Sequence, residues 1–201
     1  MNEVITDFLA QHLINLPFVS RAAGVVNMLV TESGGKPNKI PVAPLIYTLN
    51  GEDNNCDVEA DYHSLVPDGK EVGILYFEEI DGAKLKEDGN RRINTWVGKL
   101  KLVFWSNLKK VGNDTTIGDL ERIILSNIPR KITANGSFLG ATVKTTKILP
   151  KRPSPFDKYS YKETKTLYLS LPYGYTSLEI NYTALTSPNC PTNIVLNPEI
   201  C

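Results

Sequence analysis

The 201-residue chain has few cysteines, few histidines and no long hydrophobic run. No stretch approaches the roughly 18 apolar residues that span a bilayer, so we expect no membrane-spanning helix. The first sixteen residues have acids where a secretory signal has Lys or Arg, so we expect no signal peptide. The three cysteines, Cys56, Cys190 and Cys201, form no CxxC pair. We interpret them as reduced thiols of a protein made in the cytosol.

The sequence also lacks the usual anchors of catalysis. It contains no GxSxG, GxxxxGK[ST] or GxGxxG motif, which argues against the common hydrolase, nucleotide and dinucleotide sites. His12 and His63 are far apart in sequence, and no second Cys or His pair with zinc spacing accompanies Cys56. We therefore expect no catalytic residues, no cofactor and no zinc site.

One acidic segment has the alternating carboxylates of a calcium loop. Asp57, Glu59 and Asp61 alternate, but the sixth position of an EF-hand loop requires Gly and is Tyr62 here. A solvated acidic loop is the better interpretation, so we expect no metal ion at this place.

The formal net charge of zero conceals a very uneven distribution. Residues 52–90 contain 12 acids against 3 bases, and residues 91–165 contain 16 bases against 5 acids. Zero net charge argues against a strongly basic nucleic-acid-binding protein. The segments are either two solvated loops of different composition or two flanks of opposite charge. Opposite flanks would let copies of the chain attract one another head to tail.

Two segments have the apolar periodicity of amphipathic helices. The first ends before Pro17 and has a stripe of Val4, Ile5, Phe8, Leu9, His12, Leu13 and Leu16. We interpret His12, on this stripe, as a core or interface residue. The second begins with Thr116 and Asp119, spaced as in a capping box, and ends at Pro129. Its stripe consists of Ile117, Leu120, Ile123, Ile124 and Ile128.

Strand patterns occupy much of the remaining chain. Residues 72–80 and 93–107 predict a long β-hairpin with its tip between 81 and 90. In its second strand Trp96, Leu100, Leu102 and Phe104 share one face, and Lys99 and Lys101 share the other. Residues 40–47 predict an edge strand, and 131–149 one or two strands. Alternation over 167–171 and 178–183 predicts a closing hairpin.

These elements predict an α+β fold, with an antiparallel sheet, a long β-hairpin and two main helices packed on one face. Residues 1–186 are expected to form a single domain with loop insertions at 50–71 and 150–163. Residues 187–201 are expected to form an extended C-terminal tail.

Basic residues after the long hairpin are the candidate interaction residues. They are Lys109, Lys110, Lys144, Lys147, Lys151 and Arg152, with Trp105, Phe156, Tyr159 and Tyr161 near them in sequence. Neither a recognition helix nor a stacking motif accompanies them. A basic lining that faces DNA without sequence preference is compatible with the charge, and so is contact with a neighbouring subunit.

Three features together carry a resemblance to a known class of proteins. They are the N-terminal helix, the run KLKLVFWSNLKKVG over 99–112, and the patterned segment 167–185 through LPYGY. In this order they resemble the tail-terminator and head–tail joining (tail-completion) proteins of tailed bacteriophages, over residues 1–185.

The resemblance implies a tail-terminator-like structural protein of the virion, made in the host cytoplasm. Such a subunit would form an oligomeric ring in the neck or tail around the DNA channel. Its partners would be copies of itself and neighbouring portal, neck or tail proteins, with genomic DNA passing nearby and no membrane. The alternative is a non-enzymatic β-rich module that binds protein or carbohydrate.

Overall fold

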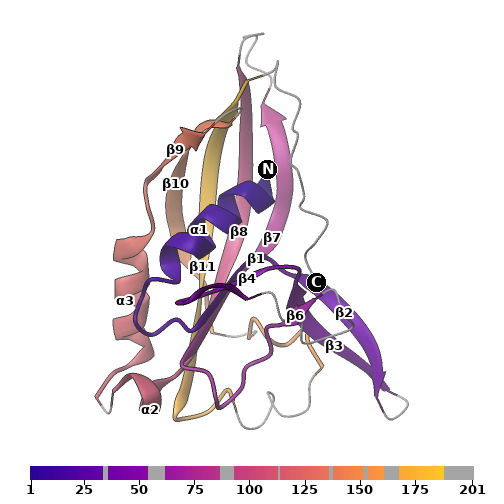
Figure 1. Cartoon of the computed structure of the whole chain (residues 1–201), viewed down its shortest axis with the longest axis vertical. Helices are drawn as coiled ribbons and strands as arrows, with labels where there is room; N and C mark the ends of the chain where they lie inside the picture. Colours follow the sequence, from indigo (N-terminus) through magenta and orange to yellow (C-terminus); the bar gives the residue numbers. More distant parts are fainter. Residues whose placement is uncertain are drawn as a thin grey trace.

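The computed structural model describes residues 1–33, 36–53, 62–86, 93–112, 114–135, 138–151, 154–160 and 168–187. Within these ranges it is a β-rich α+β fold with two sheets (Figure 1). The helices are α1 (Asn2–Leu13), α2 (Leu108–Val111) and α3 (Ile117–Asn127). The small sheet has the order β2 (Asn27–Ser33), β3 (Lys36–Ala43) and β6 (His63–Ser64). The large sheet has the order β5 (Gly51–Asp53), β4 (Ile46–Thr48), β1 (Arg21–Val25), β7 (Gly73–Lys86), β8 (Asn94–Asn107), β11 (Tyr173–Thr186), β10 (Phe138–Ile148) and β9 (Lys131–Asn135).

The large sheet is mixed, so the prediction of an antiparallel sheet is confirmed only in part. Strand β1 runs parallel to β7, with Ala22 opposite Leu75, whereas the other neighbouring strands pair antiparallel. A parallel neighbour requires a long connection. The connection between β1 and β7 contains the three strands of the small sheet and the strands β4 and β5.

The long hairpin predicted from the sequence is confirmed. Strands β7 and β8 each contain 14 residues and pair antiparallel. At roughly 3.3 Å per residue each strand is about 45 Å long. The hairpin therefore extends well past α1 (Figure 1). Strand β7 continues to Lys86, so the expected tip begins later than residue 81; residues 87–92 lie outside the described ranges.

The prediction of a closing hairpin from residues 167–171 and 178–183 is wrong. Residues 168–172 form turns, and Tyr173–Thr186 is one continuous strand, β11. Strand β11 lies between β8 and β10 and pairs antiparallel with both. The alternation of residues 178–183 correctly predicted a strand, because one face of β11 is buried. The alternation of 167–171 did not identify a strand, and Leu167 lies outside the described ranges.

Helix α1 buries a face that differs from the expected stripe. Ile5, Leu9 and Leu13 are buried as predicted, but they share the buried face with Asn2, Thr6 and Ala10. Phe8 and His12 are exposed at its flank. His12 is therefore not a core residue, because the docking face is rotated from the apolar stripe toward smaller side chains; its interpretation as an interface residue stays a prediction.

Two hydrophobic cores lie on opposite faces of the large sheet. On the helix face, Leu100, Leu102 and Phe104 of β8 pack in one cluster with side chains of both α1 and α3. On the opposite face, Val103 and Trp105 pack in a second cluster with residues of β3 and of the 154–160 loop. The face alternation predicted for β8 is confirmed, and both main helices contribute to the same core.

The described part of the 150–163 loop packs against its own chain. Phe156 and Tyr159 are each 2% exposed, and Trp105 is fully buried. These three aromatic rings are not available to stack on nucleic-acid bases. Tyr161 lies outside the described residues.

Candidate interaction surface

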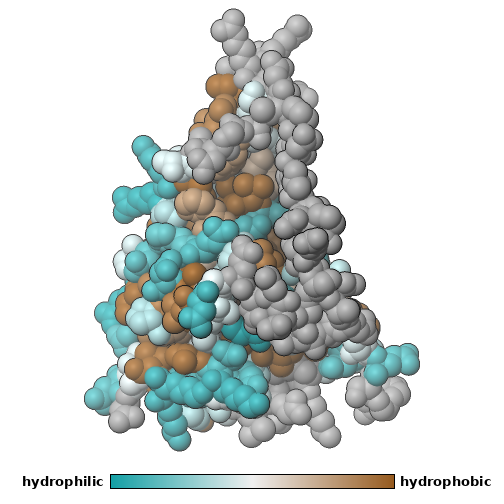
Figure 2. Space-filling model, viewed as in Figure 1, coloured by the Kyte–Doolittle hydropathy of each residue, from teal (hydrophilic) through white to brown (hydrophobic). Residues whose placement is uncertain are grey.

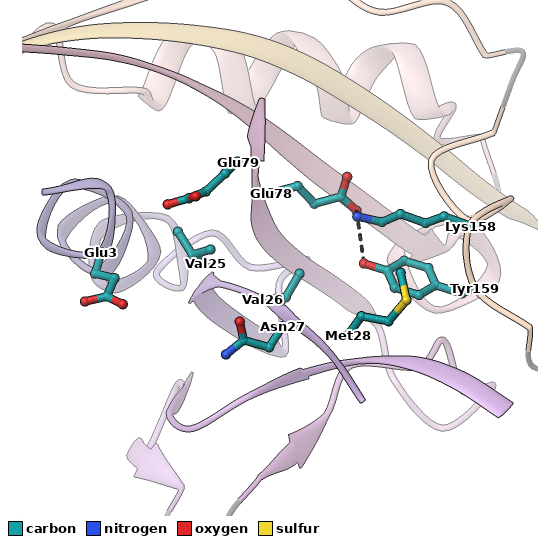
Figure 3. Close-up of a pocket in the computed structure, with 9 residues that line it drawn as sticks. All are labelled: Glu3, Val25, Val26, Asn27, Met28, Glu78, Glu79, Lys158 and Tyr159. Carbon is teal, nitrogen blue, oxygen red and sulfur yellow. Dashed lines mark hydrogen bonds and ion pairs between the residues drawn. The ribbon is translucent and has the colours of Figure 1, made fainter. Parts of the chain in front are cut away.

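A buried charge network marks where the second core ends. The Glu78 side chain on β7 is 8% exposed and binds Lys101 Nζ at 3.2 Å and Lys158 Nζ at 3.1 Å. Tyr159 Oη donates a hydrogen bond of 3.1 Å to Glu78 Oε1. Figure 3 shows Lys158 and Tyr159 pointing toward Glu78 from the 154–160 loop. The network ties this loop to the large sheet.

Beyond this network, the strand register places lysines together on the face opposite the helices. Lys99 and Lys101 alternate with the buried Leu100 and therefore point away from the helix face. The register of β7 shifts twice, between Glu79 and Asp81 and between Asp81 and Lys84, so that Lys84 pairs with Val97 and Lys86 with Thr95. Since residues 95, 97, 99 and 101 share one face, Lys84 and Lys86 point to the same side.

A bulge in β10, between Thr145 and Lys147, adds the lysines of this strand to the face. Lys144 lies opposite Asn181, and Lys147 lies opposite Glu179. Positions 179 and 181 share a face of β11, so the two lysines do as well, although they are three residues apart. Lys131 of β9 joins them because it pairs with Thr142, which pairs with Thr183.

We call this set the lysine face, and it comprises Lys84, Lys86, Lys99, Lys131, Lys144 and Lys147. All six side chains are exposed, and none forms an ion pair with an acid among the described residues. Asp81 and Glu179 lie on the neighbouring positions, so the face is positive on balance. Such an arrangement suits an anionic surface.

The structure unites only part of the set of basic residues predicted from the sequence. Lys144 and Lys147 belong to the lysine face, whereas Lys109 and Lys110 are exposed on α2, at the opposite end of β8. Lys110 Nζ donates to the backbone oxygen of Lys70. Lys151 is exposed just after β10, and Tyr175 Oη donates to its carbonyl oxygen at 3.2 Å. Arg152 lies outside the described residues.

The beginning of α1 is fixed to the middle of the sheet. Tyr182 Oη donates to Asn2 Oδ1, and Asn2 Nδ2 donates to Glu79 Oε1 at 2.7 Å. The Tyr182 ring lies over Gly98 of β8, where a Cβ atom would come within 2.5 Å of the phenol oxygen. Burial, and next the Glu79 carboxylate, raise the pKa of Tyr182 to about 12. The phenol therefore stays protonated and keeps its donor role.

An acid-lined cavity of about 390 Å³ lies between α1, the start of β2, β7 and the 154–160 loop (Figure 3). Its carboxylates are Glu3, Glu78 and Glu79. The Glu78 carboxylate already binds two lysines and Tyr159, and the Glu79 carboxylate accepts a hydrogen bond from Asn2. In the described part of the chain, no three His, Cys, Asp or Glu residues form a group that could hold a metal ion.

The other chemical candidates from the sequence do not converge on this surface. His63 is buried on β6, whereas His12 is exposed on α1. The cysteines and the calcium-like carboxylates Asp57, Glu59 and Asp61 lie outside the described residues.

Apolar side chains are exposed at the far end of the sheet, beyond the lysine face. Leu85 on β7 is 51% exposed, Leu139 on β10 is 43% exposed, and Leu185 on β11 is 37% exposed. Figure 2 shows hydrophobic surface over this end of the sheet. None of the described helices has both the length and the apolar composition to cross a membrane.

Comparisons with known proteins found no matching family model, no matching curated protein and no matching solved structure.

Proposed function

We propose that the chain is a structural protein of the virion of a tailed bacteriophage. In this proposal it forms an oligomeric ring in the neck or tail, as a tail terminator or head–tail connector, around the DNA channel. The observation that carries the proposal is the long β7–β8 hairpin, which extends past α1 from a sheet covered by helices on one face. A helix, strands, a long hairpin, a second helix and closing strands follow one another along the chain, in an order that resembles that of the phage proteins.

The two edges of the large sheet support ring formation. Strand β5 forms one edge and β9 the other, and the two strands differ in sequence and surroundings. A subunit with two different contact edges makes heterologous contacts, and these close into rings when the rotation between neighbours allows it. The exposed apolar end of the hairpin provides a further surface for a neighbour in the virion.

The charged groups with close partners have structural roles in this proposal. Glu78 holds the 154–160 loop, and Asp119 caps α3. Because these contacts account for both carboxylates, the proposal includes no catalytic step and no cofactor. Its partners are copies of the chain and the neighbouring portal, neck or tail proteins.

Light scattering after size exclusion, followed by negative-stain microscopy, tests the proposal directly. We expect a species at a fixed multiple of 22.3 kDa that images as an annulus. Antibody labelling of virions should place the protein at the neck or tail. A strictly monomeric protein at high concentration and low salt, with no label on virions, would refute the proposal.

One cavity favours the second candidate, a β-rich module that binds protein or carbohydrate. It measures about 390 Å³ and lies where α2, β11 and the turn before β11 meet. Its lining includes the side chains of Leu169, Leu171, Tyr173 and Tyr175, and Leu171 is 86% exposed. Aromatic and apolar walls of this size suit a small ligand or a side chain of a partner. A monomer whose melting temperature rises with an added oligosaccharide or peptide would favour this candidate.

A further inference from the structure

We infer that the β9–β10 side of the lysine face binds the acidic segment 52–61 of a neighbouring copy. This inference rests on the proposed ring and names the contact that would build it. The participating lysines are Lys131, Lys144 and Lys147. The segment contains Glu52, Asp53, Asp57, Glu59 and Asp61 and no basic residue.

The two partners belong to opposite ends of one sheet. Segment 52–61 begins within β5, the edge strand at one end of the large sheet. Lys131 lies on β9, the edge strand at the other end, and Lys144 and Lys147 lie on the adjacent β10. When two subunits form only one such contact, each keeps one unused patch for a further copy. The contact joins unlike edges and repeats head to tail.

The lysines at this edge have no acidic partner within the described chain. Lys144 and Lys147 are exposed, and their cross-strand neighbours are Asn181 and Glu179. Glu179 Oε1 accepts a hydrogen bond from Thr146 Oγ1 at 3.0 Å and forms no ion pair among the described residues. The positive charge of the edge is thus available to a carboxylate from outside.

The backbone at this edge also has unused pairing capacity. Strand β9 pairs with β10 only as far as Thr142, and Val143 donates to the carbonyl of Arg130. No described strand pairs with the outer edge of β10 over 144–148. The acidic segment of a neighbour would find backbone hydrogen-bonding groups beside lysine ammonium groups there.

The zero net charge favours a second copy over DNA as the occupant. A chain with a positive face and no net charge has a matching excess of acid elsewhere, so it attracts itself and has little long-range attraction for a polyanion. The buried Trp105, Phe156 and Tyr159 offer no stacking platform for bases.

Two complementary charge reversals test the contact. Variant A carries Lys131→Glu, Lys144→Glu and Lys147→Glu, and variant B carries Asp53→Lys, Asp57→Lys and Glu59→Lys. The matched control carries Lys39→Glu, Lys70→Glu and Arg122→Glu, three exposed bases on β3, the 65–72 connection and α3. Assembly is measured by light scattering at low salt, and folding by circular dichroism and thermal melting.

We expect variants A and B each to associate about 100-fold more weakly than the native chain, because every contact then joins like charges. An equimolar mixture of A and B should assemble again, since each A–B contact restores opposite charges. The control should assemble like the native chain, and rising salt should weaken native assembly.

Several results would overturn the inference. If variant A assembles like the native chain, or if folded A and B do not assemble together, this contact is wrong although the ring survives. If the native chain itself never assembles, the ring and the contact both fail. If variant A loses affinity for duplex DNA and still assembles, the face is a nucleic-acid surface instead. Should variant A not fold, Lys→Gln changes at the same three positions must still weaken assembly.

Discussion

Lys101 on β8 and Glu78 on β7 are cross-strand neighbours whose Nζ and Oε2 atoms lie 3.2 Å apart. This pair separates two halves of one sheet face. On one side, β3 and the 154–160 loop cover the second core; on the other, the described residues leave the lysines exposed. The same carboxylate also binds the loop through Lys158, so one buried charge serves both the fold and the boundary of the surface.

Replacing Glu78 with Gln should destabilise the chain by about 2–4 kcal/mol, because a buried carboxylate that serves two lysines is removed. The partly exposed Lys158 can reach water, which moderates the loss. Urea denaturation should show a lower midpoint, with faster proteolysis in the 154–160 loop. Asp81→Asn, an exposed acid on the same strand, is the control and should change stability by less than about 0.5 kcal/mol. Equal midpoints for the two variants would contradict a structural role of Glu78.

Replacing Gly98 with Ala should displace the Tyr182 ring, since the new Cβ atom would lie 2.5–2.6 Å from its atoms. We expect a loss of about 1–3 kcal/mol and a loosened N-terminal turn of α1, because Tyr182 also donates to Asn2. Hydrogen exchange of the α1 amides reports the second effect. Gly82→Ala is a matched control on the same hairpin, because its Cβ would meet nothing within 4 Å. Identical behaviour of the two variants would rule out the ring contact as the cause.

Asp7 should make stability depend on pH. Burial, and next the Glu3 carboxylate, raise the pKa of Asp7 from 3.8 to about 6. The folded chain therefore holds this proton more tightly than the unfolded chain does, and stability contributed by Asp7 is lost as pH rises from about 4 through 6. The loss amounts to at most about 3 kcal/mol.

Asp7→Asn should remove this dependence and be more stable than the native chain at pH 7.5. Urea midpoints of both proteins at pH 4.5 and 7.5 provide the measurement. The exposed Asp114→Asn is the control and should leave the native pH profile in place. A native profile that survives in Asp7→Asn would show that another group is responsible.

Thr116→Ala should cost about 1 kcal/mol, because it removes the capping box of α3. The Thr116 side chain accepts from the Asp119 amide, and the Asp119 carboxylate accepts from the Thr116 backbone. Thermal melting with Thr115→Ala as the neighbouring control gives the difference. If the two variants melt together, the cap has no measurable share in stability.

Local patterns predicted the elements whose faces have sharply different surroundings. The alternation around Leu100 and Leu102 identified β8 correctly because one side is core and the other bears lysines. Thr116 and Asp119 located the start of α3, because a capping box depends only on neighbouring residues.

Other features depend on distant parts of the chain, so local patterns could not predict them. Lys144 and Lys147 are three residues apart, which in a regular strand places them on opposite faces; only the bulge aligns them. The position of His12 depended on which face of α1 docks on the sheet. The parallel pairing of β1 with β7 depends on the path of about fifty intervening residues.

The place of β11 in the sheet has a consequence for synthesis on the ribosome. Strands β9 and β10 are made before β11, yet only β11 joins them to β8. Helix α1 is synthesised first, but its Asn2 can accept the hydrogen bond from Tyr182 only after β11 has been synthesised. Contacts of such large sequence separation slow folding. The nascent chain therefore completes its sheet only after residue 186 has left the exit tunnel, and until then the β9–β10 hairpin is a separate unit.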